Sequence, residues 1–136
     1  MMYRCLIANR GEIAVRIIRA CRELNIETVA IYAKGDENSL HVSLADQAIC
    51  IGEANPLDSY LNIDRIISAA KVTESNVIHP GYGFLSESTN FAKAVEDNHI
   101  HFIGPSKTTM EMMGDKITAR QTVKQAGVRS EERRVG

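Results

Sequence analysis

Short apolar runs alternate along this chain with segments in which apolar residues recur every three or four positions. The apolar runs predict strands at 3–8, 28–32, 47–51, 77–80 and 101–103. The periodic segments predict helices at 12–24, 38–45, 59–71, 89–98, 107–113 and 115–126. Strands that alternate with helices are typical of βαβ units, so we expect an α/β fold with a parallel sheet flanked by helices.

Three loops that contain glycine follow strands of this expected sheet. They lie at residues 9–12, 80–87 and 104–106. Ligands of open parallel sheets bind beyond the carboxyl ends of the strands. These loops are therefore the places where the pattern predicts a binding site.

The first loop, Asn9-Arg10-Gly11-Glu12, stands where a Rossmann fold carries the G-x-G-x-x-G fingerprint of dinucleotide binding. Of that fingerprint only Gly11 is present, which leaves little room for a pyrophosphate to approach the backbone. Glu12 would suit the positive end of the helix dipole but would repel a phosphate. We therefore interpret this strand, turn and helix as a Rossmann-like unit in which the loop has a structural role.

The second loop reads His79-Pro80-Gly81-Tyr82-Gly83-Phe84-Leu85-Ser86-Glu87. Gly81 and Gly83 permit backbone angles that leave amide N–H groups free to face an anion. Tyr82 adds a ring with a hydroxyl, and Glu87 adds a carboxylate. The chemistry indicates a ligand-binding loop, although a plain glycine turn would also explain it.

The third motif, Met113-Gly114-Asp115-Lys116, joins two expected helices. Gly114 can end the first helix, and Asp115 can cap the second. Lys116 then falls in a first helical turn, where the dipole disfavours a cation. This position suggests a lysine that reaches towards an anion such as a nucleotide phosphate; a solvated surface lysine is the alternative.

Composition narrows the class of protein. The 136 residues carry 16 Lys and Arg against 17 Asp and Glu, a balance that favours neither nucleic acid nor an acidic membrane as partner. No apolar run approaches the roughly 20 residues that span a bilayer, and no signal peptide is evident, so we expect a cytoplasmic protein, or a mitochondrial matrix protein whose presequence has been removed.

The three cysteines form no C-x-x-C pair and are expected to be reduced and buried. The four histidines show no zinc-ligand pattern, so we expect no metal site here.

Several long stretches together resemble one family. They are Ile7–Ala14, Ser59–Asn62, His79–Glu87, Phe102–Pro105 and Met113–Lys116, and they occur in one order. The set is similar to the N-terminal domain of biotin carboxylases. That family includes the carboxylase subunit of acetyl-CoA carboxylase, which serves fatty acid biosynthesis, and the first domain of pyruvate and propionyl-CoA carboxylases. The resemblance covers residues 4–128, nearly the whole chain.

The resemblance implies a Rossmann-like pre-ATP-grasp domain from an ATP-dependent ligase. Such enzymes use ATP and Mg²⁺ to activate bicarbonate, and they carboxylate biotin on a biotin carboxyl carrier protein. By matched position, Lys116 would contact ATP, while Gly81, Tyr82, Gly83 and Glu87 would line the cleft that faces the phosphates and biotin. A homodimer and a carboxyltransferase partner are implied as well, and the partner would choose the acyl-CoA or keto acid that is carboxylated.

The chain departs from this family in two respects. It stops at Gly136, before an ATP-grasp or a C-terminal domain, and the fragment alone is therefore expected to be inactive, with no catalytic residue of its own. Residues 129–136 are mostly charged and do not continue the family pattern, so we expect a domain at 1–128 and a disordered tail at 129–136. Two alternatives remain open: a nicotinamide-dependent dehydrogenase domain and a non-enzymatic interaction domain.

Overall fold

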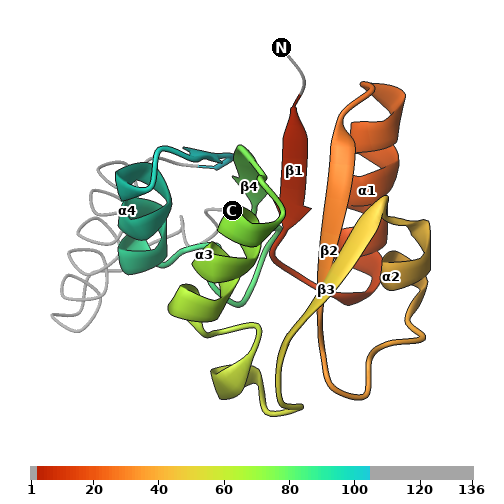
Figure 1. The fold of residues 1–136 in the computed structure, drawn as a ribbon, viewed down its shortest axis with the longest axis horizontal. Helices are drawn as coiled ribbons and strands as arrows, with labels where there is room; N and C mark the ends of the chain where they lie inside the picture. Colours follow the sequence, from red (N-terminus) through yellow and green to blue (C-terminus); the bar gives the residue numbers. More distant parts are fainter. Residues whose placement is uncertain (1–2, 105–136) are drawn as a thin grey trace, which may run out of the picture.

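A five-stranded parallel sheet forms the centre of the computed structural model, which describes residues 3–104 (Figure 1). Its strands run in the order β3-β2-β1-β4-β5. Their bounds are β1 Arg4–Ile7, β2 Glu27–Ala33, β3 Gln47–Gly52, β4 Val77–His79 and β5 His101–Phe102. Every pair of neighbours is parallel, which confirms the expected α/β class.

Helices cover both faces of the sheet (Figure 1). Their bounds are α1 Gly11–Glu23, α2 Leu40–Leu44, α3 Ile63–Val72 and α4 Thr89–Asp97. Successive residues of β1 point to opposite faces, as a strand requires. Leu6 joins a buried cluster with residues of α3 and α4, whereas Cys5 and Ile7 join another with residues of α1. A strand buried on both faces explains why β1 reads as a continuous apolar run.

The helix expected from Ser59 begins only at Ile63. The side chain of Asn62 accepts a hydrogen bond from the backbone nitrogen of Arg65 at 3.0 Å and so caps the helix. Ser59 and Tyr60 lie before that cap and are buried, and a short 3-10 turn at Pro56–Asp58 precedes them. The spacing of apolar residues predicted the helix itself, but the helix begins where the side chain of Asn62 caps it.

The expectation that all three cysteines are buried is wrong for Cys50. Cys5 and Cys21 are buried between β1 and α1, as expected. Cys50 lies in β3, which is an edge strand of the sheet, and its side chain is exposed. The apolar run around Cys50 does not reveal whether its strand lies at the centre or at the edge of the sheet.

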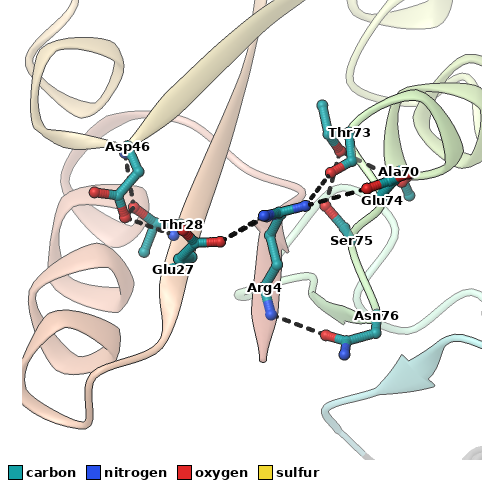
Figure 2. Close-up of polar contacts among 9 residues, drawn as sticks. All are labelled: Arg4, Glu27, Thr28, Asp46, Ala70, Thr73, Glu74, Ser75 and Asn76. Atoms are coloured by element: carbon teal, nitrogen blue, oxygen red, sulfur yellow. Dashed lines mark hydrogen bonds and ion pairs between the residues drawn. The ribbon is translucent and has the colours of Figure 1, made fainter. Parts of the chain in front are cut away.

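Arg4 links the amino ends of three neighbouring strands (Figure 2). Its Nη2 lies 2.7 Å from Oε1 of Glu27, at the start of β2. Its Nη1 donates to the carbonyl oxygen of Thr73 at 2.8 Å, and its backbone nitrogen donates to Oδ1 of Asn76 at 2.9 Å, both just before β4. These contacts stabilise the end of the sheet opposite to the glycine loops, and we assign them a structural role.

Some of the expected features lie outside the described residues. They are the helices at 107–113 and 115–126, the candidate Lys116 and the segment 129–136. Within residues 3–104, every helix is too short or too polar to reach across a lipid bilayer.

Candidate functional site

Two of the glycine-containing loops follow neighbouring strands at the point where the order of the sheet reverses. The chain builds outward from β1 in one direction through β2 and β3, and in the other through β4 and β5. The loop after β1 leads to α1 on one face, and the loop after β4 leads to α4 on the other. Loops that diverge in this way mark the usual ligand position of such folds, so the structure brings the expected loops together there.

Asn9 joins these two loops. Its side chain is 2% exposed, and its Nδ2 donates to the carbonyl oxygens of Pro80 at 2.8 Å and Tyr82 at 2.7 Å. Its Oδ1 accepts from the backbone nitrogen of Arg10 at 2.8 Å. The loop after β1 therefore has a structural role, because a buried side chain within it holds the loop after β4.

Gly81 is required where it stands. It adopts a φ of +66°, which favours glycine, and a Cβ at this position would lie 2.8 Å from Nδ2 of Asn9. Only a residue without a side chain lets the backbone approach Asn9 closely enough for both hydrogen bonds. Gly83 also has a positive φ, of +72°, but a Cβ there would have no neighbour within 4 Å.

His79 holds the start of the same loop. Its Nδ1 accepts a hydrogen bond from the backbone nitrogen of Gly81 at 3.0 Å, which requires that nitrogen to be unprotonated. Burial lowers the pKa of His79, and this favours the neutral ring. Neutral His79 thus acts as a backbone acceptor at the root of the loop.

The loop presents the other candidate residues to solvent. Tyr82 is 67% exposed although its backbone is held by Asn9, and Gly83 and Glu87 are exposed as well. A fixed backbone that carries an exposed aromatic ring, a glycine and a carboxylate can offer an amide donor and a flat apolar surface to a ligand. The structure therefore brings Gly81, Tyr82, Gly83 and Glu87 together on one loop, while Lys116 lies outside the described residues.

Tyr60 is a residue near this loop that the sequence interpretation left without a role. It is 1% exposed; its hydroxyl donates to Oδ2 of Asp36 at 2.7 Å and accepts from the backbone nitrogen of Ala33 at 3.1 Å. Burial and the hydrogen bond to Asp36 raise the pKa of Tyr60, so the phenol stays protonated. The only sequence signal for Tyr60 was its place in the family-like stretch Ser59–Asn62.

Other features of the described chain lie away from these loops. A hollow of about 490 Å³ lies between β3 and α3, at the edge of the sheet, and includes Ile49, Asn62 and Arg65 in its lining. It is not near the point where the strand order reverses, so we do not assign it to the candidate site. Residues 3–104 contain no group of three or more His, Cys, Asp or Glu side chains that could hold a metal ion.

Comparison with known protein families shows which family the chain belongs to. The family model described as the biotin carboxylase N-terminal domain matches residues 1–110. The chain belongs to this family. The match includes both loops of the candidate site, so the structural unit around Asn9 and Tyr82 is that of a biotin carboxylase N-terminal domain.

Individual relatives agree with the family match. Biotin carboxylase 1 of Bacillus subtilis (strain 168) is 57% identical over 128 residues, which are 94% of this chain and 28% of that protein. The biotin carboxylase subunit of a pyruvate carboxylase has a solved structure that is 54% identical, with a TM-score of 0.82, and the match covers 94% of this chain and 28% of the other.

A third relative is seen with bound ligands. The biotin carboxylase domain dimer of the Hydrogenobacter thermophilus 2-oxoglutarate carboxylase, solved with MgADP, ADP and bicarbonate, is 51% identical with a TM-score of 0.82. The match covers 94% of this chain and 28% of that one. The sequence therefore spans little more than a quarter of the length of these relatives. Membership of this family, rather than of a dinucleotide-binding one, removes the reason for the dehydrogenase alternative.

Proposed function

We propose that this chain is the N-terminal part of an ATP-dependent biotin carboxylase, the ligase that carboxylates carrier-bound biotin with bicarbonate. The observation that carries the proposal is the loop after β4. Its backbone is held by Asn9 and His79 at the point where the strand order reverses, and it presents Tyr82 to solvent. Family membership supplies the chemistry that this loop would serve.

Each candidate residue has a role in this proposal. Gly83 and Tyr82 offer a backbone amide and an aromatic face to biotin, and Gly81 lets the loop approach Asn9. Glu87 would line the part of the cleft that faces the phosphates, and Lys116 would contact ATP. The cofactors are ATP, Mg²⁺ and biotin; the Hydrogenobacter thermophilus relative, solved with MgADP and bicarbonate, supports the first two.

The same proposal names partners and a compartment. The partners are a biotin carboxyl carrier protein, a carboxyltransferase and a second copy of the carboxylase; the domain dimer of the Hydrogenobacter thermophilus relative supports the last. Free cysteines suit a reducing compartment, so we place the activity in the cytoplasm or the mitochondrial matrix. Fatty acid biosynthesis is the pathway if the carboxyltransferase acts on acetyl-CoA.

The division of the chain is part of the proposal as well. We assign residues 1–128 to the family domain and leave residues 129–136 outside it. Matches that cover 128 residues of this chain support the first boundary. Because these residues correspond to 28% of a complete relative, we propose that they do not carboxylate biotin unless the remaining domains accompany them.

A chimera tests the activity. Residues 1–128 of this chain replace the matching residues of Biotin carboxylase 1 from Bacillus subtilis. The expected result is ATP hydrolysis that depends on both bicarbonate and free biotin, whereas the 136-residue chain alone gives no turnover above a blank. A well-folded chimera without this activity would refute the proposed function.

Lys116 is tested in the same chimera. Lys116→Gln keeps the aliphatic stem and removes the charge, so we expect ATP binding to weaken by about 1.5 to 3 kcal/mol, the range for a charge-assisted hydrogen bond. Stability should be unchanged or slightly higher, because the helix that the sequence predicts from residue 115 would lose a cation from its first turn. An ATP titration and a urea melt of both proteins separate the two effects, and an unchanged ATP affinity would contradict the assignment.

A further inference from the structure

Phe84 stands out in the candidate loop because of its backbone. It has a φ of +44°, in the left-handed region that disfavours residues other than glycine, and it directly follows Gly83. Such a conformation persists only where the surroundings hold it in place. Phe84 is 37% exposed, so burial in the core does not explain its position.

The ring of Tyr60 supplies the missing support. The rings of Tyr60 and Phe84 are stacked, with centroids 5.4 Å apart and an angle of 27° between their planes. An aromatic pair at this separation attracts beyond the effect of area burial alone. Phe84 therefore rests on a buried ring that belongs to a different part of the chain.

Tyr60 is itself rigidly placed. Its hydroxyl lies between the carboxylate of Asp36, at 2.7 Å, and the backbone nitrogen of Ala33, at 3.1 Å, both at the carboxyl end of β2. The guanidinium of Arg10 lies 5.4 Å from the centroid of the ring, and its Nη2 lies 3.4 Å from Oδ1 of Asp36. The ring thus has fixed contacts with the sheet and with the loop after β1.

The loop after β4 consequently has two separate attachments. Asn9 holds its first half through the carbonyl oxygens of Pro80 and Tyr82, and Tyr60 holds its second half through Phe84. Tyr82 belongs to the first attachment through its carbonyl oxygen, and Gly83 lies between it and Phe84. With the backbone fixed on both sides, the direction in which the side chain of Tyr82 leaves the chain and the direction of the Gly83 amide are both set.

We infer that Tyr60 is a positioning residue for the biotin end of the site, acting through its stack with Phe84 and not by touching the substrate. The inference rests on the proposed function, because it assigns biotin to Tyr82 and Gly83. It goes further by naming the side chains that set their position. Loss of the stack would let the loop adopt other conformations, and ligand binding would then have to select the competent one.

The kinetic test uses the chimera described above. Phe84→Leu removes the ring but keeps an apolar side chain, and the KM for free biotin is expected to rise about three- to tenfold, a factor that corresponds to about 0.7 to 1.4 kcal/mol. The kcat and the KM for ATP should stay within about twofold, as expected when binding that the ground state and the transition state share is lost. Phe84→Tyr keeps the stack and should behave as the unchanged protein, and so should Leu57→Ala, which removes an exposed apolar side chain elsewhere.

A second measurement does not depend on activity. In the 136-residue chain, the amide of Ser86 donates to the carbonyl oxygen of Gly83 at 2.9 Å. Phe84→Leu should speed hydrogen exchange at Ser86 several-fold and leave Ala92, in α4, unchanged, whereas Phe84→Tyr should alter neither. Tyr60→Leu should speed exchange at Ser86 as well; because that variant also opens the core, the surface variant at Phe84 is the decisive one.

The outcomes separate the two proposals. An inactive unmodified chimera refutes the proposed function, and the exchange data alone then decide whether Tyr60 and Phe84 hold the loop. An active chimera in which Phe84→Leu leaves the KM for biotin unchanged refutes the positioning role. Unchanged exchange at Ser86 refutes it in either case.

Discussion

The side-chain amide of Asn9 donates to the carbonyl oxygen of Tyr82 at 2.7 Å and so ties the end of β1 to the middle of the loop after β4. The same nitrogen donates to Pro80 at 2.8 Å, so both N–H groups of the amide are used. The conformation of this loop is therefore set in part by a residue 73 positions away in sequence.

Asn9→Ala should destabilise the domain. It leaves the carbonyl oxygens of Pro80, at a buried position, and of Tyr82, at a partly buried one, without their donor, and we expect the free energy of unfolding to fall by about 1 to 3 kcal/mol. Urea unfolding of the 136-residue chain measures the loss. Asn55→Ala is the matched control, because Asn55 is exposed and its side chain accepts a hydrogen bond from the backbone of Leu57, at 3.0 Å. Equal losses in the two variants would show that Asn9 is an ordinary loop residue.

Alanine at Gly81 and at Gly83 should have unequal effects. Both glycines have positive φ, so each substitution costs about 1 to 2 kcal/mol of backbone strain. At Gly81 the new Cβ also meets Nδ2 of Asn9 at 2.8 Å and should displace it, which adds about 1 kcal/mol or more. Denaturant melts of both variants test this difference.

A double substitution shows whether Asn9 is the cause. In an Asn9→Ala background the amide that lies closest to the new Cβ is gone, and only the contact with Cγ1 of Ile13, at 3.3 Å, remains of those within 3.4 Å. The additional cost of Gly81→Ala should then shrink towards that of Gly83→Ala, since residues in contact are not additive. If the losses in free energy of unfolding are additive, Asn9 is not the cause of the extra cost of Gly81→Ala.

The sequence predicted the fold well because its signals are local. The apolar run of β1 and the apolar stripe of α1 follow from burial on both faces of a parallel sheet. The long-range contacts were not predictable, because no local pattern says that Asn9 will face Tyr82 or that Tyr60 will stack on Phe84. The glycine loop was recognised from its residue types, while the side chains that position it were not.

The exposure of Cys50 leads to a prediction about the reactivity of the three thiols. With Cys50 exposed and Cys5 and Cys21 buried, a thiol reagent should modify one cysteine per native chain and all three after unfolding. The hydrogen bond with Cys21 and burial both raise the pKa of Cys5, which slows its reaction further. Mass spectrometry after brief treatment with a maleimide should find the label on Cys50. Native labelling of Cys5 at a similar rate would contradict the packing between β1 and α1.

His79 should make the stability of the domain depend on pH. Burial lowers the pKa of His79 in the folded state below the value of about 6.5 that an unfolded chain has. Above that value both states are neutral and the full stability is present. As the pH falls through it, the unfolded state binds the proton first, and the free energy of unfolding decreases. Protonation would also remove the acceptor that Nδ1 offers to the backbone of Gly81 at 3.0 Å.

His79→Asn isolates this effect, because the side-chain oxygen of asparagine can accept from Gly81 but does not titrate near neutral pH. Urea melts between about pH 5 and pH 8 should show a shallower loss of stability in this variant than in the unchanged chain. His101→Asn is the control at an exposed histidine and should keep the steeper profile. If the free energy of unfolding falls equally steeply with pH in His79→Asn and in the unchanged chain, the ring of His79 does not cause the pH dependence.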